Sequence, residues 1–226
     1  MRNLQRFLVW VGIVGALQFF VLTTLAMRVY PGGTIHDRSH AGYSFWHNYF
    51  SDLGRRRSWN GASNHLSNLL FDNSLLLVGI SLILFFISLP GIFKNPAARQ
   101  WAVLAAVAGV VSALCYIGIA HNPLDVHYYI HTIYVRAGFI AFLGMSFFYL
   151  RAIREEPAYP NRYANAFAFF AIVLFIQIAI MLLGPRSFTS PFALFLQASA
   201  QKVVVYAEML CMVYQCRGAL KVLNYE

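Results

Sequence analysis

The sequence predicts an all-α fold: a polytopic membrane protein in which a single domain, residues 1–226, forms one bundle of six transmembrane helices. Three observations predict it. Hydrophobic residues make up 59% of the chain, charged residues make up only 11%, and the apolar residues gather in six long runs. A soluble domain carries about 25% charged residues, so this deficit indicates that most of the chain lies in lipid.

Each apolar run is long enough to span a membrane, which takes roughly 20 mainly apolar residues. The first, FLVWVGIVGALQFFVLTTLAM, is too long for the core of a cleaved signal peptide and is followed by no small-residue cleavage site, so we expect a retained helix. Proline, glycine or charge separates the later runs, as in LPGIFKNPAARQ, HNPLD and GPRSFTSP. Backbone groups cannot stay unpaired in hydrocarbon, so the runs must be helices, and short connections make consecutive helices antiparallel neighbours. The predicted helices cover about residues 8–28, 65–90, 100–120, 128–150, 163–183 and 191–215, with an outer loop at 30–64.

The distribution of lysine and arginine predicts the orientation in the cell membrane, because cytoplasmic loops carry an excess of both. A cytoplasmic N-terminus places nine of them inside: Arg2, Arg6, Lys94, Arg99, Arg151, Arg154, Arg162, Arg217 and Lys221. It places six outside: Arg28, Arg38, Arg55, Arg56, Arg57 and Arg186. We therefore expect both termini to be cytoplasmic.

The net charge of +9 is scattered over short loops at both faces of the predicted bundle. This pattern favours attraction to anionic membrane lipids over binding to nucleic acid. A lipid-facing helix could also contact a second copy of the chain or another subunit of a membrane complex, and the sequence leaves both partners open.

The outer loop is unusually rich in aromatic and polar residues. Its segment GYSFWHNYFSDLG, residues 42–54, combines amphipathic aromatics of the kind found at headgroup level with a histidine, a serine and an aspartate. We expect a short re-entrant or interfacial piece on the outer mouth of the bundle. Ser51 and Asp52 either begin a helix or turn by accepting backbone N–H bonds, or contribute to a functional site.

The stretch HNPLDVHYYIH, residues 121–131, places an aspartate and three histidines at the start of the fourth helix. Pro123 fits a turn or a pre-helical position, so Asp125 is expected to cap this helix while pointing across the mouth. His127 and His131 are four residues apart and therefore share a helix face. A helix cap followed by a buried histidine is the structural alternative.

Ionisable residues inside apolar helices are costly and usually face a bundle interior. Asp72, Arg136 and Lys202 are such residues, and their similar depth predicts that Asp72 contacts Arg136 or Lys202, directly or through water. We expect a polar pocket that opens outward, with Asp52 and Asp125 at its rim, His131, Asp72 and Arg136 in its wall, and Lys202 toward its floor. A purely structural ion pair is the alternative.

Four short motifs occur in a recognisable order: SDLG (51–54), LFDN (70–73), PLDVHYYIH (123–131) and QK (201–202). Together they resemble the domain-of-unknown-function 998 family of six-helix bacterial and archaeal membrane proteins, over most of the chain. Asp72 stands where that family's pattern has phenylalanine directly before asparagine. Lys202 replaces an arginine and so loses the planar fork that grips carboxylate or phosphate. The resemblance implies a six-helix fold and no particular reaction, and its matched positions add Asn73 and Gln201 to the ligand-binding candidates Asp72, Arg136 and Lys202.

Three functions fit these residues. The preferred one is a protein that binds or handles a lipid or other amphiphile, with Arg136 and Lys202 meeting an anionic headgroup. The second is an intramembrane lipid hydrolase, in which either Ser51 attacks with the help of a histidine, His47 or His131, or zinc activates water. The zinc ligands would be His127 and His131 with Asp52, Asp125 or His121. The third is a non-catalytic subunit of a larger membrane complex. The catalytic candidates are Ser51, Asp52, Asp125 and His131.

Overall fold

Helices dominate the computed structural model, which describes residues 2–224. In chain order they are α1 (Arg2–Val29), α2 (Phe50–Leu53), α3 (His65–Ser88), the 3-10 helix η1 (Leu89–Ile92), α4 (Pro96–His121), α5 (Tyr128–Glu155), α6 (Asn161–Leu183) and α7 (Pro191–Asn224). Six are long and apolar enough to cross a membrane: α1, α3 with η1, α4, α5, α6 and α7. The predicted all-α bundle with six spans is therefore confirmed.

Most of the long helices extend past the predicted apolar runs. The largest difference is in α7, which continues to Asn224 rather than ending near residue 215. The added residues, CRGALKVLN, mix Arg217 and Lys221 with good helix formers such as Ala219 and Leu220, so a break in the purely apolar run does not end the helix. At its start α4 has Pro96 in the first turn and Asn95 as N-cap, whose side chain accepts the Ala97 N–H at 2.9 Å.

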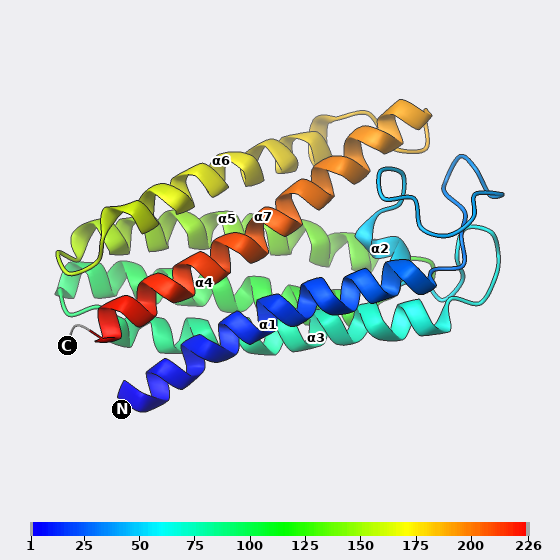
Figure 1. The fold of residues 1–226 in the computed structure, drawn as a ribbon. Coiled ribbons are helices and arrows are strands. Elements are labelled where there is room, and N and C mark those ends of the chain that lie inside the picture. Colours follow the sequence, from blue (N-terminus) through cyan, green and yellow to red (C-terminus); the bar gives the residue numbers. More distant parts are fainter. Residues whose placement is uncertain (1, 225–226) are drawn as a thin grey trace.

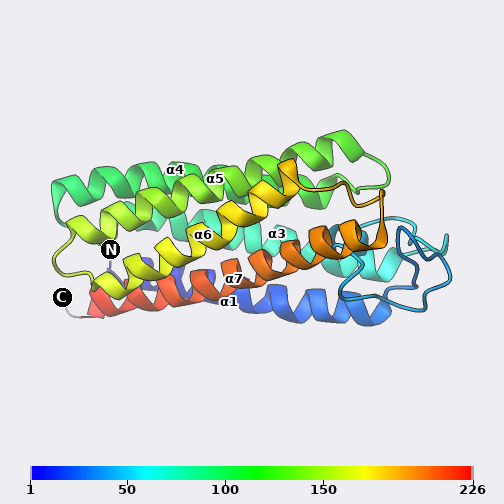
Figure 2. The same ribbon diagram turned by 90° about the horizontal axis from the view of Figure 1, so that it is seen from above.

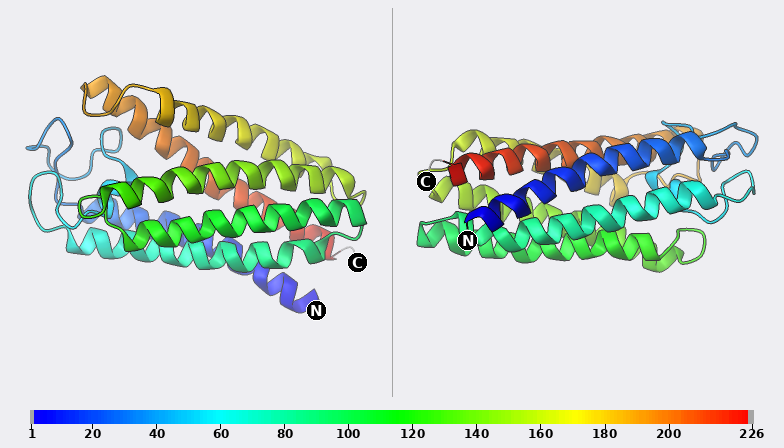
Figure 3. Two further views of the ribbon diagram at one scale, coloured as in Figure 1. Left: turned by 180° about the vertical axis from the view of Figure 1, so that it is seen from behind. Right: turned by 60° about the horizontal axis from the view of Figure 1, so that its bottom comes forward.

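The six spans form a closed ring in which each helix packs on the one before it, and α7 returns to α1. Neighbouring helices run antiparallel (Figure 1). Figure 2 shows α4 and α5 side by side, and the view from behind in Figure 3 shows the same pair. The start of α1 and the end of α7 lie at one end of the bundle, which we call the terminal end, and the 30–64 loop lies at the opposite, loop end (Figure 1).

The outward faces of the spans are apolar. Large side chains such as Val103, Phe169 and Leu210 are exposed, whereas the interior is filled by aromatic and small residues. Gly15 of α1 shows how closely two spans approach: a Cβ there would lie only 2.3 Å from the Cβ of Ser81 in α3. Small residues at such contacts let membrane helices pack backbone to backbone. An apolar outside and a close-packed inside are what a lipid-embedded bundle requires.

Hydrogen bonds between its own residues hold the 30–64 loop in shape. The backbone N–H of Gly33 donates to the carbonyl of His40 at 2.8 Å, and the side chain of Asn64 donates to the carbonyls of Leu53 and Arg55. The short helix α2 is buried and contacts α1, α3 and α7. The expected piece on the mouth of the bundle is thus a buried single turn, and it carries Ser51 into the ring of spans.

Candidate functional site

A serine from the loop and a histidine from a span meet at the loop end of the bundle. The Oγ of Ser51 lies 3.1 Å from the Nε2 of His131, and the Nδ1 of the same ring lies 2.7 Å from the backbone carbonyl oxygen of Asn122. Ser51 lies in α2, and His131 lies in the first turn of α5. Both residues are buried. We call them the Ser51–His131 pair.

The contact with Asn122 fixes the protonation of the imidazole ring. A carbonyl oxygen can only accept a hydrogen bond, so in the neutral ring the proton sits on Nδ1. Nε2 is then an acceptor, and the hydroxyl of Ser51 donates to it. This is the tautomer that a histidine needs to take a proton from a serine. The turn that ends α4 supplies the carbonyl, because Asn122 is the C-cap residue of that helix.

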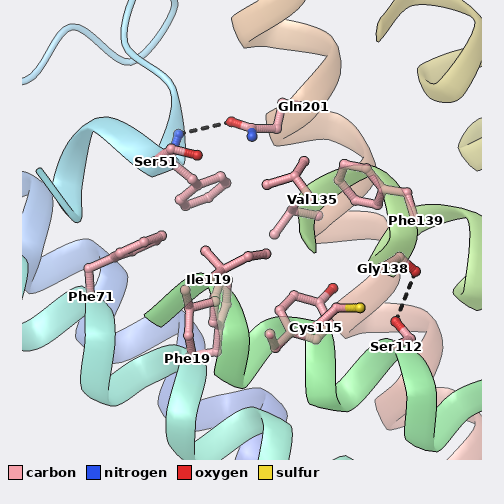
Figure 4. Close-up of a pocket in the computed structure, with 14 residues that line it drawn as sticks. Phe19, Ser51, Phe71, Ser112, Cys115, Ile119, Val135, Gly138, Phe139 and Gln201 are labelled. Carbon is pink, nitrogen blue, oxygen red and sulfur yellow. Dashed lines mark hydrogen bonds between the residues drawn. The ribbon is translucent and has the colours of Figure 1, made fainter. Parts of the chain in front are cut away.

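An apolar cavity lies beside the Ser51–His131 pair, inside the ring of spans. The space open to the centres of water-sized molecules is about 50 Å³, and the whole gap between the walls, with its opening to the outside included, is about 500 Å³. Ser51 forms part of its wall, and Figure 4 shows Ser51 and Gln201 on one side and Cys115 and Ser112 on the other. Helices α1 to α5 and α7 supply the lining residues: Phe19, Phe50, Ser51, Phe71, Leu75, Ser112, Cys115, Tyr116, Ile119, Val135, Gly138, Phe139, Gln201 and Val205.

Gln201 of α7 is the second polar group beside Ser51 in the cavity wall. Its Oε1 accepts the backbone N–H of Phe50 at 2.9 Å (Figure 4). Because that N–H can only donate, the oxygen of the amide must face α2, and the Nε2 group is left with both of its donor hydrogens. Within residues 2–224 no hydrogen bond engages this Nε2. The cavity therefore has an uncommitted donor next to the Ser51 residue.

The other hydroxyl groups of the cavity wall are already paired. The hydroxyl of Ser112 donates to the carbonyl of Gly138 at 3.0 Å (Figure 4), and the hydroxyl of Tyr116 donates to Glu208. Glu208 is wholly buried on α7, and its second oxygen has no hydrogen-bond partner in the described part of the chain. Tyr116 and Glu208 are not among the site residues that the sequence predicts. A carboxylate inside an apolar span was the signal that could have found this pair.

Asp52 follows Ser51 but faces away from His131. Its carboxylate accepts three hydrogen bonds: from the side chain of Asn48 at 3.1 Å, from the backbone N–H of Tyr49 at 2.9 Å and from the indole of Trp59 at 2.8 Å. Burial raises the pKa of Asp52 above its ordinary value, and these hydrogen bonds and the charge of Arg55 oppose that rise. Asp52 is thus a structural centre of the 30–64 loop, and no hydrogen bond joins it to the imidazole ring.

Lys202 was expected to lie toward the floor of the pocket, but it is not among the residues that line the cavity. Its ammonium group donates to the backbone carbonyl of Asn48 and lies 5.3 to 5.7 Å from the ring centres of Tyr43, Phe45 and Phe50. The segment that carries α2 covers this cation. The depth of Lys202 in its helix predicted burial correctly but said nothing about the direction of the side chain.

The prediction of a direct contact between Asp72 and Arg136 or Lys202 is also wrong. The carboxylate of Asp72 accepts a hydrogen bond from the side chain of Asn68 at 2.8 Å, and within residues 2–224 it forms no ion pair with either cation. Arg136 is exposed on the outer face of α5 and so does not form part of the cavity wall. Asn73 is exposed as well, and its side chain donates to the carbonyl of Leu69.

Asp125 does not cap α5, because the N-cap position belongs to His127, which makes no side-chain cap bond. The two carboxylate oxygens of Asp125 instead accept the backbone N–H groups of Arg56 and Arg57, each at 3.0 Å. The aspartate is exposed and ties the turn after α4 to the 30–64 loop. It holds the two segments that carry Asn122 and Ser51 against each other.

The residues do not fit a zinc site. Both ring nitrogens of His131 already have partners in the protein, and His127 is exposed at the helix start. Within residues 2–224 no three side chains of histidine, cysteine, aspartate or glutamate lie close enough to share a metal ion. A structural or catalytic zinc ion needs at least three such ligands.

The fold and this site define the chain as a polytopic integral membrane protein with a buried serine–histidine pair beside an apolar cavity. A scan against protein-family models finds no match, and searches of curated proteins and of solved structures find none either.

Proposed function

We propose that the protein binds the hydrocarbon chain of a membrane lipid or another amphiphile in the apolar cavity, with the polar group of that molecule beside the Ser51–His131 pair. The distribution of polar atoms in the cavity wall is the observation that carries the proposal. Ser112 and Tyr116 have their hydroxyls engaged within the protein, whereas Gln201 offers a free donor next to Ser51. An apolar cavity with a few convergent polar groups is the usual form of a ligand site.

The charges near the cavity favour an amphiphile whose buried polar group is uncharged. Lys202 is turned toward Asn48, and Arg136 lies on the outside of α5. Neither cation is in the cavity wall, so the headgroup contact expected for both does not form there. An ester, amide or hydroxyl group suits the hydroxyl of Ser51 and the free amide donor of Gln201 better than a phosphate does.

The proposal includes the orientation of the chain and its family. The excess of lysine and arginine at the terminal end supports cytoplasmic termini in the cell membrane, with the loop end outside. Membership of the domain-of-unknown-function 998 family is supported by the convergence of its motifs. Ser51 of SDLG contacts His131 of PLDVHYYIH, and Gln201 of the QK pair contacts the residue before Ser51.

A matched pair of substitutions in α7 tests the proposal. Val205 forms part of the cavity wall and is 7% exposed, whereas Val203 lies on the lipid-facing side and is 56% exposed. The full chain is purified in detergent, and co-purifying lipid is quantified by native mass spectrometry and by extraction. Val205→Phe should lose most of the bound amphiphile, and Val203→Phe should retain it.

Val135→Phe fills the same cavity from α5 and is the second test variant if Val205→Phe does not fold. Size-exclusion chromatography and the thermal midpoint in detergent identify folded variants. The proposal is abandoned if the folded cavity-filling variants carry as much bound amphiphile as the wild-type chain, or if the wild-type chain carries none.

A further inference from the structure

We propose that Ser51 is a nucleophile and His131 its general base, and that the protein cleaves a carboxylic ester of a long-chain amphiphile by acyl transfer to Ser51. This inference rests on the proposed function, because the cavity must hold the acyl chain for its carbonyl carbon to reach Ser51. It adds a chemical reaction to a site whose binding role is argued above.

The first support is the geometry of the nucleophile and the base. A separation of 3.1 Å between Ser51 Oγ and His131 Nε2 lies within the range of about 2.6–3.2 Å at which a base takes a proton directly. The carbonyl of Asn122 holds the ring in the tautomer that leaves Nε2 free to accept. In a serine hydrolase triad an aspartate has this orienting role. Here a backbone oxygen has it, and Asp52 is committed to Asn48, Tyr49 and Trp59.

The second support is the position of the pair relative to the cavity. Ser51 is one of the residues that line the cavity, and its hydroxyl contacts His131 directly behind that wall. Burial of His131 and Ser51 excludes most water, which makes each hydrogen bond to a developing charge stronger. An ester whose chain occupies the apolar space presents its carbonyl group to Ser51.

The third support is Gln201. The hydrogen bond from Phe50 fixes its amide, and its Nε2 donors have no partner in residues 2–224. When Ser51 attacks, negative charge develops on the former carbonyl oxygen. A donor next to the nucleophile, positioned before the reaction, can stabilise that charge. Removing one such donor typically slows the chemical step by about 100-fold to 1,000-fold.

The reaction is balanced with water as the second reactant. A bond forms between Ser51 Oγ and the carbonyl carbon, and the hydroxyl proton passes to His131 Nε2. The ester C–O bond then breaks, and the departing alkoxide takes that proton and leaves as an alcohol. Water next attacks the acyl-serine and gives a proton to Nε2, and the carboxylic acid departs while Ser51 regains its proton. No metal or redox partner is required.

A long-chain alkyl fluorophosphonate tests the inference on the full chain in detergent or in vesicles. This probe reacts covalently with activated serines, and peptide mass spectrometry locates the adduct. We expect wild-type protein to be labelled at Ser51 and Ser51→Ala to be unlabelled. His131→Gln should react at least about 100-fold more slowly, because a positioned general base typically contributes 100-fold or more.

The loop supplies a matched control in a second serine–histidine contact outside the cavity. Ser44 Oγ lies 3.3 Å from His47 Nδ1, and neither residue lies in the cavity wall. Ser44→Ala should be labelled as fast as wild type. Gln201→Leu should lower the rate of hydrolysis of a nitrophenyl ester at saturating substrate, with a smaller effect on KM.

Two results overturn the inference: wild-type protein that stays unlabelled, or labelling that is unchanged by Ser51→Ala. Because labelling of the wild-type chain needs no variant, a misfolded His131→Gln does not weaken the test. Failure of the inference is distinct from failure of the proposed function. If Val205→Phe loses the bound lipid but the wild-type chain is never labelled at Ser51, the protein binds an amphiphile without cleaving it.

Discussion

Lys202 of α7 donates a hydrogen bond to the backbone carbonyl of Asn48, and this bond ties the 30–64 loop to the interior of the last span. Lys202 is only 1% exposed, and no carboxylate of residues 2–224 forms an ion pair with it. The rings of Tyr43, Phe45 and Phe50 surround its charge instead. Contacts of this kind with aromatic faces are worth more where water is excluded. The lysine therefore holds in place the segment that carries Ser51.

Replacing Lys202 by methionine should loosen the loop. The substitution removes one of the two donors to the buried carbonyl of Asn48, which keeps only the hydroxyl of Tyr43 at 3.2 Å. A hydrogen bond from a charged donor typically contributes about 1.5–3 kcal/mol. We expect faster trypsin cleavage at the arginine run 55–57, together with a lower thermal midpoint in detergent. Val203→Met, on the lipid-facing side of the same helix, is the control and should cleave like wild type. Unchanged cleavage of Lys202→Met would show that the bond does not restrain the loop.

Asp125→Asn should destabilise the contact between the 121–127 turn and the loop nearly as much as Asp125→Ala does. Both carboxylate oxygens accept backbone N–H groups, and an asparagine side chain would turn a donor toward one of them. At this exposed position we expect a loss of about 1 kcal/mol. Thermal unfolding of the two variants measures it, with His127→Gln as the control. If asparagine preserves wild-type stability while alanine does not, the aspartate acts as an ordinary helix cap.

Asp52 should make the stability of the protein depend on pH in a particular direction. Its folded-state pKa is raised above the ordinary value of 3.8, so between these two values the folded state holds a proton that the unfolded chain has lost. The free energy of unfolding contributed by this group therefore falls as the pH rises through that window, and it is constant above the folded pKa.

Thermal midpoints of wild type and Asp52→Asn, measured from pH 3.5 upward, isolate this contribution. The advantage of wild type over the variant should shrink as the pH rises through the window. The indole of Trp59 donates to Asp52, so the fluorescence of Trp59 should change when Asp52 gains or loses its proton. The Trp59→Phe variant shows how much of the tryptophan fluorescence comes from Trp59. An advantage that grows with pH would mean that the hydrogen bonds to Asp52 outweigh its burial.

Gly15→Ala should destabilise the contact between α1 and α3. The added Cβ would lie 2.3 Å from the Cβ of Ser81, so the helices must separate, and overpacking of this kind costs about 1–3 kcal/mol. Ser81→Gly in the same chain removes the clashing atom and should restore most of the loss. Val14→Ala, 60% exposed on the same helix, controls for helix propensity. Additive effects of the two substitutions would show that the two positions do not touch.

The fold was predictable from sequence because hydrocarbon imposes a single backbone solution on each apolar run. The site was predictable only in part. Ser51, His131 and Gln201 could be chosen by residue type and motif, but no periodicity relates a loop serine to a histidine eighty residues later. The carbonyl of Asn122 has no side-chain signature at all. The contacts between these residues depend on how the loop folds over the bundle.

The errors have a common physical cause. Similar depth in the membrane was taken to mean proximity, but depth leaves the rotation of each helix undetermined. Arg136 follows His131 by five residues, which turns it by about 140° around α5 at 3.6 residues per turn. With His131 facing Ser51 inside the ring, Arg136 must face outward. The same reasoning explains Asn73, which directly follows the half-buried Asp72 and lies on the lipid-facing side of α3.

Because the spans form a closed ring, the cavity can be completed only after the last span has been synthesised. Each of α3, α4, α5 and α6 emerges next to a helix that is already present, but the contact between α1 and α7 joins the first span to the last. The chain is synthesised from its N-terminus, so α7 is the last span to be made. Until α7 is inserted, the wall containing Phe19 and Ser51 stands open to the bilayer. The arrival of Gln201 and Val205 then completes the cavity, and a lipid already lying in that gap would be enclosed as the ring closes.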